Sequence, residues 1–374
     1  MAFYNLANIN VMVIEDTAFM RLMLVQVLEA LGFQKVVSFS GADKAIEHLK
    51  SISSSPYRNR AQGVDLIISD LVMAPIDGLM LLRWVRRHKQ SPDRFVPFVM
   101  LSGLADVDEV AQARDLGVTE FMAKPFSVQS MGERLMAVID APRQFVKTEE
   151  YFGPDRRRQR FYPETGDRRV NKDEGKGKAE YTTTINGKTV TFLRPANRLK
   201  EYVGGNAIST GTLPLEAMQK ALSTLDKAVE DYADWARKSI QEMARDFLEA
   251  QSNAKPRRVG LKRINEIAHE LRGQGGTFGY PLVSDFAKSL YYYTIAGSRE
   301  DDNALGIVRS HIDALRAVIN GKIEGRGGRV GEELLTVLQM AIDKFSANWT
   351  EEERLVLRRK TAVATPAKTP ATQT

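Results

Sequence analysis

Residues 65–78 read DLIISDLVMAPIDG, an apolar run that stops at the carboxylate of Asp70 and gives way to Pro, Asp and Gly. A short apolar run bounded by turn-forming residues is typical of a buried strand. Similar runs lie on either side, and each ends at a polar or charged residue: NVMVIED at 10–16, FVPFVMLSG at 95–103 and VTEFMAKP at 118–125. A fifth, shorter strand is predicted at Lys35–Phe39.

Helical patterns separate these strands. Apolar residues recur at helical spacing over five segments: Ala18–Leu31, Ala42–Ser51, Gly78–His88, Asp106–Leu116 and Val128–Ile139. Strands that alternate with helices predict a parallel sheet with helices on both faces. We therefore expect an α/β fold built on a doubly wound, five-stranded parallel sheet.

Polar side chains gather where these strands end. Parallel strands bring their carboxyl ends to one edge of a sheet, so Glu15, Asp16, Asp70, Ser102 and Lys124 are expected to meet there. Three crowded carboxylates repel one another and call for a compensating cation, and a small set of hard oxygen ligands suits Mg²⁺. Solvated acids or helix caps are the alternative, which the joint pattern of all five residues disfavours.

This set of groups suits phosphoryl transfer. A cation would screen Asp70 from an anionic phosphoryl donor, while Lys124 and Ser102 would stabilise the equatorial oxygens of the transferred group. Asp70 would then act as the nucleophile that becomes an acyl phosphate.

Residues 10–140 resemble the receiver domains of two-component response regulators, in the pieces VIEDTAFMR, DLIISDLVMAPIDG, VMLSG and EFMAKPF. The resemblance implies a flavodoxin-like fold and a sensor histidine kinase or other phosphodonor as partner. It implies the following site: Asp70 as phosphoacceptor, Glu15, Asp16, Asp70 and the Val72 carbonyl as Mg²⁺ ligands, Ser102 and Phe121 as a switch pair, Lys124 in catalysis, and a cis bond at Lys124-Pro125. The chain departs from the family at Ala74, where proline is usual; Pro75 follows.

The composition of the 374 residues limits the class of protein. The chain has no cysteine, which rules out disulfides and thiol chemistry and fits a reducing compartment. The first residues lack a secretory signal, and no apolar run is long enough for a bilayer span. We expect a cytoplasmic protein without membrane contact, and the net charge of +6 permits but does not demand an anionic partner.

Residues 143–212 differ in character from the segments around them. They are polar and carry more Lys and Arg than Asp and Glu, so a basic, largely disordered linker is predicted. Two β-branched runs around Asn186-Gly187 predict a hairpin near 180–194. The motifs DRRRQR and GDRR leave a nucleic-acid-binding role open, but acids are interspersed and no recognition motif is present, which favours a solvated tether.

The remaining chain is helical in pattern. Leu213–Gln251 is one long amphipathic stretch, and four shorter ones follow: Arg263–Arg272, Pro281–Ile295, Ala304–Ile319 and Gly331–Phe345. Short connections between them predict an all-α helical bundle over 213–347. Residues 348–374 are expected to be a disordered tail, which leaves 1–142 as the receiver domain.

One histidine of this bundle has unusual neighbours, in the stretch IAHELRGQGG at 267–276. If Ile264, Ile267, Ala268 and Leu271 form the buried stripe, His269 lies on the exposed face with Gly273 one turn along. A glycine there would let another protein approach the imidazole, which is a good nucleophile when neutral. Alternatively, His269 is an ordinary surface residue, and Gly273 and the GQGG stretch end the helix as a C-cap.

The stretch AHELRGQGGTFGYPLVSDFAKSL resembles histidine-phosphotransfer domains, on His269, Leu271, Arg272, Gly273 and Gly279. This implies that His269 is a candidate phosphohistidine and that another receiver domain is a further partner. The family often has a glutamate where this chain has Tyr291. For the other histidines, His48, His88 and His311, solvated or capping roles are expected.

Three hypotheses follow for the function. The first is a phosphorelay response regulator, in which Asp70 is phosphorylated and His269 exchanges phosphate; it is a signalling protein and not an enzyme in the usual sense. The second is a regulator controlled by phosphorylation, whose bundle docks on a partner or forms a homodimer while His269 is idle. The third, with the least support, is a nucleic-acid-binding regulator that acts through the basic linker.

Overall fold

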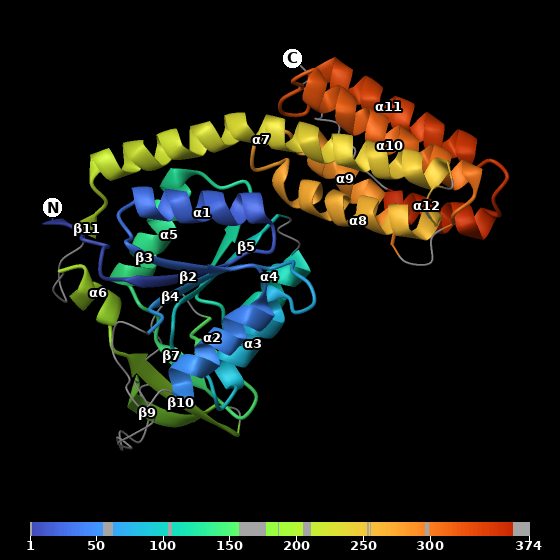
Figure 1. Cartoon of the computed structure of the whole chain (residues 1–374). Coiled ribbons are helices and arrows are strands. Elements are labelled where there is room, and N and C mark those ends of the chain that lie inside the picture. The colour runs from blue at the N-terminus through green and yellow to red at the C-terminus, as the bar shows by residue number, and fades with distance from the viewer. Residues whose placement is uncertain are drawn as a thin grey trace, which may run out of the picture. The chain divides into compact units, whose positions relative to one another are not determined.

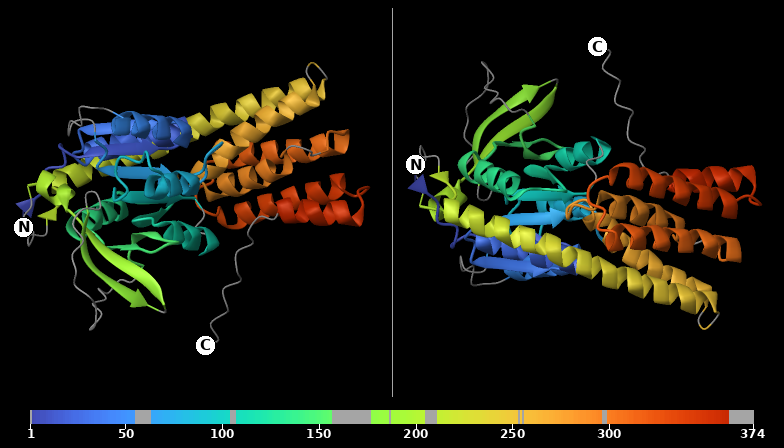
Figure 2. Two further views of the ribbon diagram at one scale, coloured as in Figure 1. Left: turned by 90° about the horizontal axis from the view of Figure 1, so that it is seen from below. Right: turned by 90° about the horizontal axis from the view of Figure 1, so that it is seen from above.

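A computed structural model describes residues 2–54, 63–103, 107–156, 177–185, 187–204, 211–252, 254, 256–295 and 299–361. The chain divides into two compact units, Met1–Asp226 and Lys227–Thr374. The division falls within the long helix α7 (Leu215–Gln251). Figures 1 and 2 label and colour the elements of both units.

The first unit is built on a five-stranded sheet in the order β3-β2-β4-β5-β6, in which all neighbouring strands are parallel. The strands are β2 (Asn10–Ile14), β3 (Lys35–Phe39), β4 (Leu66–Asp70), β5 (Phe98–Ser102) and β6 (Glu120–Ala123). The three central strands are buried along nearly their whole length, as a sheet covered on both faces requires. The predicted strand set is thereby confirmed.

Helices cover both faces of this sheet. Figure 1 shows α1 (Ala18–Ala30) and α5 (Val128–Asp140) over one face, and α2 (Ala42–Ser54), α3 (Gly78–Arg87) and α4 (Val107–Leu116) over the other. Met12, Ile14 and Ile67 of the strands pack with apolar side chains of α2 and α3. The doubly wound architecture predicted from the sequence is therefore confirmed.

The loop after β4 turns sharply so that α3 begins against the strand it follows. Asp77 caps this helix by accepting a hydrogen bond from the Met80 amide at 2.7 Å. At Gly78 an added Cβ would lie only 2.3 Å from the backbone oxygen of Asp70. Glycine therefore allows the close approach that holds the start of α3 beside the carboxyl end of β4.

A second sheet, antiparallel and in the order β8-β7-β10-β9, follows α5 along the chain. Its strands are β7 (Phe145–Lys147), β8 (Phe152–Pro154), β9 (Gly177–Ile185) and β10 (Lys188–Pro195). β9 and β10 are adjacent in a hairpin at Gly187, whose φ of 76° is in the left-handed region; Asn186 lies outside the described residues.

This sheet corrects the expectation of a largely disordered linker for residues 145–154 and 177–195. Phe145, Phe152 and Leu193 form a buried cluster against Phe95 in the loop before β5, with Phe95–Phe145 ring centroids 5.0 Å apart. The prediction of disorder rested on the polar average composition of the segment. It did not take into account that these few apolar residues pack together in one cluster. Residues 157–176, which hold most of the two arginine motifs, lie outside the described residues.

Other parts of the first unit pack on α5. Strand β1 (Ala2–Phe3) pairs in parallel with β11 (Gly211–Thr212), and Tyr4 donates a hydrogen bond of 2.5 Å to Asp140. The short helix α6 (Arg198–Tyr202) lies nearby, where buried Lys200 pairs with Asp140 at 3.3 Å. The chain therefore covers the C-terminal part of α5 with its own segments.

The second unit is helical, as the sequence predicted. After α7 come α8 (Arg257–Gln274), α9 (Pro281–Tyr293), α10 (Asp302–Asn320), α11 (Gly328–Phe345) and α12 (Glu351–Thr361). An added Cβ at Gly260 would lie 2.8 Å from the Cβ of Ala250, so α8 packs closely against α7. Tyr232 of α7 stacks on Phe278 with ring centroids 4.7 Å apart.

The expected tail at 348–374 begins later than predicted. Trp349 is buried, with Arg299 over its ring at 4.8 Å, and α12 follows with Leu357 buried. Residues 362–374 lie outside the described residues. None of the helices in the described part of the chain combines the length and the hydropathy that a membrane span requires.

Candidate functional site

Three carboxylates meet at the carboxyl edge of the parallel sheet. Glu15 and Asp16 follow β2, and Asp70 is the last residue of β4. Oxygen atoms of the three side chains lie within 4.8 Å of one another. Oxygen ligands of this kind are those that hard divalent cations prefer, so the residues present fit a divalent metal ion.

Lys124, directly after β6, is the cation that the structure provides in this pocket. Its Nζ lies 2.8 Å from Glu15 Oε2 and 2.9 Å from Asp70 Oδ1, and its side chain is only 4% exposed. The predicted Lys124-Pro125 cis peptide is confirmed, and Ala74-Pro75 is also cis. The ammonium group of Lys124, which follows the edge strand β6, therefore forms ion pairs with Glu15 and Asp70 but not with Asp16.

The pKa values of Glu15, Asp16 and Lys124 are all raised in this pocket. Burial and then repulsion by Asp70 raise the pKa of Glu15 to about 8, and the same two causes raise that of Asp16 to about 6. Burial disfavours the charge on Lys124, but the attraction of Asp70 and Glu15 outweighs it and raises the pKa of Lys124. Lys124 alone does not compensate three carboxylates, which is the condition that a bound cation relieves.

Arg21 and Thr17 support the acidic loop, and sequence reasoning gave neither a role. Arg21 Nη1 donates hydrogen bonds to the backbone oxygens of Glu15 at 2.6 Å and Asp16 at 3.1 Å. The Thr17 amide donates to Glu15 Oε1 at 3.4 Å. The signal available in the sequence was the position of Arg21, which lies one turn into the helix that follows Glu15 and Asp16 and can therefore reach back to them.

The remaining predicted receiver residues have clear places in the fold. Ser102 is buried at the end of β5, next to the strand that carries Asp70, and its backbone oxygen accepts from the Lys124 amide at 2.6 Å. Phe121 of β6 is half-buried and packs against the core cluster below α3 and α4. Val72 is exposed in the loop after β4.

His269 lies on α8 of the second unit, where Ile264, Ile267, Ala268 and Leu271 form the buried stripe as predicted. The imidazole itself is half-buried rather than exposed, because its ring centroid lies 5.3 Å from that of Tyr291 on α9.

Arg272 completes this surface. Its guanidinium carbon lies 4.4 Å from the centroid of Tyr291 and 5.9 Å from that of Tyr292. The structure thus places aromatic rings and a cation beside the histidine.

Gly273 lies inside α8, which continues to Gln274 before Gly275 ends it. An added Cβ at Gly273 would meet no atom within 4 Å, so no packing contact explains the missing side chain. The helix therefore ends within the GQGG stretch, as the alternative expected, but at Gly275 and not at Gly273. At Gly279 the φ of +83° accounts for glycine, in the turn before α9.

His311 corrects the expectation of a solvated or capping role. The residue is fully buried on α10, and its Nδ1 lies 2.8 Å from the Ile307 carbonyl oxygen, which can only accept a hydrogen bond. The Nε2 of the neutral ring therefore accepts from Ser289 Oγ of α9, also at 2.8 Å. Burial lowers the pKa of His311 to about 4.

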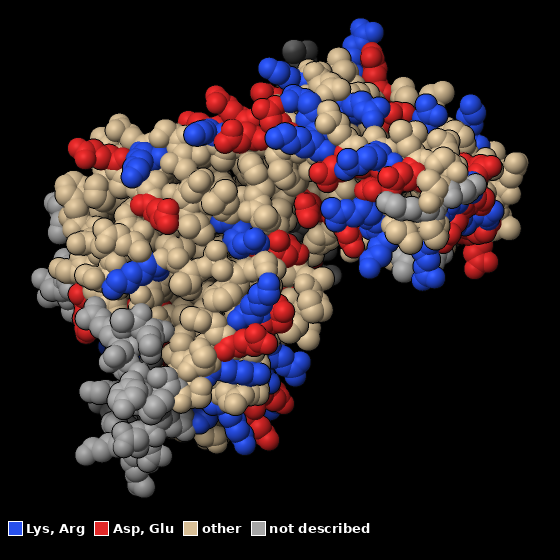
Figure 3. Space-filling model, in the orientation of Figure 1, with Lys and Arg blue, Asp and Glu red and all other residues tan. Residues whose placement is uncertain are grey.

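The charged side chains do not gather into one basic surface on the visible face of the molecule. Figure 3 shows Lys and Arg interspersed with Asp and Glu over both units on that face. Exposed ion pairs of the helical unit include Arg263–Glu266 at 3.1 Å and Arg329–Glu333 at 2.9 Å. The described residues on this face therefore form no basic stripe of the kind that favours phosphate-backbone binding.

Comparison with known proteins identifies the first part of the chain. Residues 11–136 match the family model described as "Response regulator receiver domain". A probable chemotaxis protein CheY of Rhizobium etli is 29% identical over 134 residues, which cover 36% of this chain and 95% of that protein. Chemotaxis protein CheY of Bacillus subtilis is 26% identical over 130 residues and is covered to 97%.

A probable transcriptional regulatory protein of Picosynechococcus is 27% identical over 138 residues, which are 37% of this chain and 51% of that protein. Among solved structures, a response regulator receiver protein from Pseudomonas putida matches with 30% identity and a TM-score of 0.29, covering 34% of this chain and 94% of that one. These matches reach about a third of this chain, and the family model ends before the helical unit. The acidic pocket and the matched family together identify residues 11–136 as a response regulator receiver domain, which a largely helical C-terminal region follows.

Proposed function

We propose that this chain is a phosphorelay response regulator that receives a phosphoryl group on Asp70 and exchanges phosphate through His269. The observation that carries the proposal is the pairing of Lys124 Nζ with Glu15 and Asp70 in a pocket of three carboxylates. The phosphodonor would be a sensor histidine kinase or another phosphorylated protein, as a receiver domain generally implies. In the alternative, Asp70 is also phosphorylated, but His269 carries no phosphate and the helical region docks on a partner or forms a homodimer.

Asp70 is the nucleophile in this proposal. A carboxylate oxygen of Asp70 forms a bond to phosphorus while the bond between phosphorus and the donor's leaving atom breaks, which yields an acyl phosphate. Asp70 is 7% exposed, so only a small part of its surface is accessible to a phosphodonor. A divalent ion bound by Glu15, Asp16 and Asp70, for which we propose Mg²⁺ with the Val72 carbonyl as a further ligand, would neutralise charge in this pocket.

Lys124 and Ser102 position and stabilise the transferred group. Lys124 is held by Glu15 next to Asp70, so its ammonium is in place before the donor arrives. Ser102 comes from the neighbouring strand end. Groups fixed in this way stabilise charge that develops on phosphoryl oxygens without having to reorganise.

The phosphorylated pocket would act on the domain surface through the predicted switch pair. Ser102 would move toward the phosphate, and half-buried Phe121 would turn into the space beside it, which changes the surface near α4 and α5. In this chain α5 already contacts other parts of the first unit through Tyr4 and Lys200. The output of the switch would therefore reach these covering segments.

His269 is the proposed second phosphate carrier. An imidazole nitrogen would attack the phosphorus of an aspartyl phosphate, and the bond between that phosphorus and the aspartyl oxygen would break. Two observations support this role. The space at Gly273 leaves one side of the helix open beside the histidine, and Arg272 supplies positive charge near the same ring. The contact between His269 and Tyr291 favours the alternative, since it covers part of the imidazole.

The two possibilities can be separated on the full chain with acetyl phosphate and Mg²⁺ as the phosphodonor system. The label on wild type, Asp70→Asn and His269→Gln is measured and then tested for stability in acid and in base. An acyl phosphate is lost in base, whereas a phosphohistidine is lost in acid and survives in base. We expect both kinds of label in wild type, only the base-labile kind in His269→Gln, and neither in Asp70→Asn.

Other results would decide against parts of this proposal. If wild type carries only base-labile phosphate and a separately supplied receiver domain does not change this, His269 is idle and the alternative holds. If Asp70→Asn labels as well as wild type, Asp70 is not the phosphoacceptor. We retain the domain boundaries 1–142, 143–212, 213–347 and 348–374 as a working proposal, with the ordered sheet and α12 as the differences described above.

A further inference from the structure

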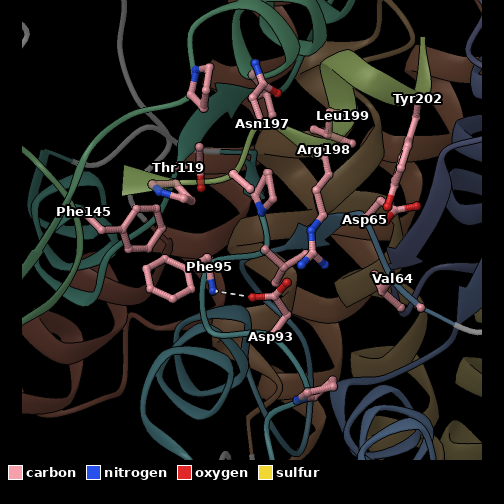
Figure 4. A pocket seen from close by; sticks show the side chains of 18 of the residues that line it. Val64, Asp65, Asp93, Phe95, Thr119, Phe145, Asn197, Arg198, Leu199 and Tyr202 are labelled. Carbon is pink, nitrogen blue, oxygen red and sulfur yellow. Dashed lines mark hydrogen bonds between the residues drawn. The ribbon is translucent and has the colours of Figure 1, made fainter. Parts of the chain in front are cut away.

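A cavity of about 370 Å³ opens at the end of the parallel sheet opposite Asp70. Figure 4 shows side chains that line it. They come from α2, the starts of β4 and β6, the loop before β5, the segment from α5 into β7, and the segment from β10 into α6. A volume of this size lies in the range of small-molecule sites. No receiver element alone makes this cavity, because residues 195–202 form one of its walls.

The walls combine aromatic and charged groups. Phe95 and Phe145 are in contact, and with Tyr202 they provide aromatic surface. Four charged side chains line the cavity, and all are half-buried: Asp65, Asp93, Arg143 and Arg198. The site therefore suits a ligand that has both an apolar body and polar groups.

Three of these charged groups already have partners. Asp65 Oδ2 accepts from the Asn10 amide at 2.9 Å, and Asp93 Oδ1 accepts from the Phe95 amide at 3.0 Å. Arg143 Nη1 donates to the Thr119 carbonyl at 3.4 Å. The carboxylates retain acceptor capacity for N–H groups, since each oxygen can accept more than one hydrogen bond.

Arg198 is different. Its side chain extends from α6 into the cavity, and it forms neither an ion pair nor a hydrogen bond with any described residue. A half-buried guanidinium with free donors is a ready partner for a carboxylate or phosphate group. No ion pair joins Arg198 to Asp65 or Asp93 in the described part of the chain.

We propose that this cavity is a binding site for a small aromatic anion that carries N–H groups. The ring would lie against Phe95 and Phe145, the N–H groups would donate to Asp65 and Asp93, and Arg198 would hold the anionic group. A purine nucleotide and an aminoaryl carboxylate share this chemistry. The site is distinct from the acidic pocket and does not depend on the proposed phosphorelay.

Isothermal titration of the full chain with GMP, AMP and 4-aminobenzoate tests the proposal and separates the two sources. We expect saturable binding of at least one of these probes at millimolar concentration or below. Arg198→Gln should weaken it by about tenfold or more, because a charged hydrogen bond is lost. Arg194→Gln, four residues earlier and exposed outside the cavity, is the matched control and should bind as wild type does.

Thermal unfolding of both variants shows whether the fold is kept. A second variant, Phe95→Leu, retains apolar volume but removes the ring and should also weaken binding. The proposal is overturned if none of the three probes saturates wild type, or if Arg198→Gln and Arg194→Gln bind the probe with the same affinity. Binding of nucleotides alone identifies a phosphate ester as the anion, and binding of 4-aminobenzoate alone identifies a carboxylate.

Discussion

The acidic pocket of the receiver domain and the His269 surface of the helical unit are built in opposite ways. Lys124, Glu15 and Asp70 come from three strands and are buried in mutual contact, so each depends on the others for its charge. His269 is half-buried on a single helix, and its neighbours include Tyr291, over whose ring the Arg272 guanidinium lies. A substitution in the buried pocket should therefore affect the stability of the fold. A substitution on the exposed face of α8 should have little effect on stability and should matter mainly where a partner protein binds.

The largest difference between the regions is expected at Asp70. Asp70→Asn removes the proposed nucleophile and should reduce labelling by acetyl phosphate to background. Asp65→Asn, immediately before the same strand at the opposite end of the sheet, is the matched control and should label normally. Phosphate incorporation with Mg²⁺ measures both, and equal labelling of the two variants would contradict the assignment of the phosphoacceptor.

The second prediction concerns the stability of the pocket. Lys124→Gln leaves Glu15 and Asp70 buried without their cation and should lower the free energy of unfolding by about 3–5 kcal/mol in the absence of metal. Mg²⁺ should restore part of the loss. Urea unfolding with and without Mg²⁺ measures this.

Lys200→Gln provides the control for the Lys124 variant. Lys200 is also buried, but it pairs with Asp140 away from the acidic pocket. Its replacement should destabilise the protein without a larger response to Mg²⁺ than wild type shows. The same Mg²⁺ response in both variants would mean that the ion does not bind beside Glu15 and Asp70.

The helical unit should depend on pH through His311 rather than His269. The pKa of His311 is lowered to about 4 in the folded chain, from 6.5, so between these values only the unfolded chain binds the proton. Stability is therefore fully present above pH 6.5 and falls as the pH falls to 4, by roughly 3 kcal/mol. Urea unfolding from pH 7 to pH 4 measures the change.

His311→Gln should remove this contribution and flatten the pH dependence relative to wild type. His88→Gln is the control, because His88 is exposed on the receiver domain and lies outside the buried site. An unchanged pH dependence in His311→Gln would show that protonation of this imidazole is not linked to unfolding.

The smallest expected effect compares two glycines of the same helix. Gly273→Ala should stabilise α8 by about 0.5–1 kcal/mol, since the new Cβ meets open space. Gly260→Ala should destabilise it, because its Cβ would lie 2.8 Å from Ala250 and 3.0 Å from the Asp246 carbonyl oxygen. Thermal unfolding separates these signs.

A bulkier change at Gly273 tests the function of that open space. Gly273→Leu should fold but lose phosphate transfer to or from His269, because the side chain would extend beside the imidazole. Transfer at the wild-type rate in Gly273→Leu would show that partner access does not require the glycine.

Several features of the fold were accessible from the sequence because they depend on local pattern. Each apolar run that ended in a charged residue became a strand of the parallel sheet, and the strand ends fixed which acids would meet. The buried stripe of α8 followed from helical spacing alone. The same reasoning gave no role to Arg86, which lies in a run that also holds Arg83 and Arg87.

Arg86 shows why such residues escape prediction. It is fully buried and donates hydrogen bonds to the carbonyl oxygens of Gly117, Arg94 and Val96. Those acceptors come from loops that only the folded chain brings together. Burial of a polar group depends on whether partners are available opposite it, and a one-dimensional pattern does not contain that information.

The sequence by itself thus determined the parallel sheet, the acidic edge and the helix that carries His269, because periodicity and strand ends are local properties. Only the tertiary structure decided that Lys124 bridges Glu15 and Asp70, that His311 is buried against Ser289, and that the segment after Pro142 folds into a second sheet. Each of these rests on contacts between residues far apart in the chain. Their energy depends on distance and burial, which the fold sets and the order of residues does not express.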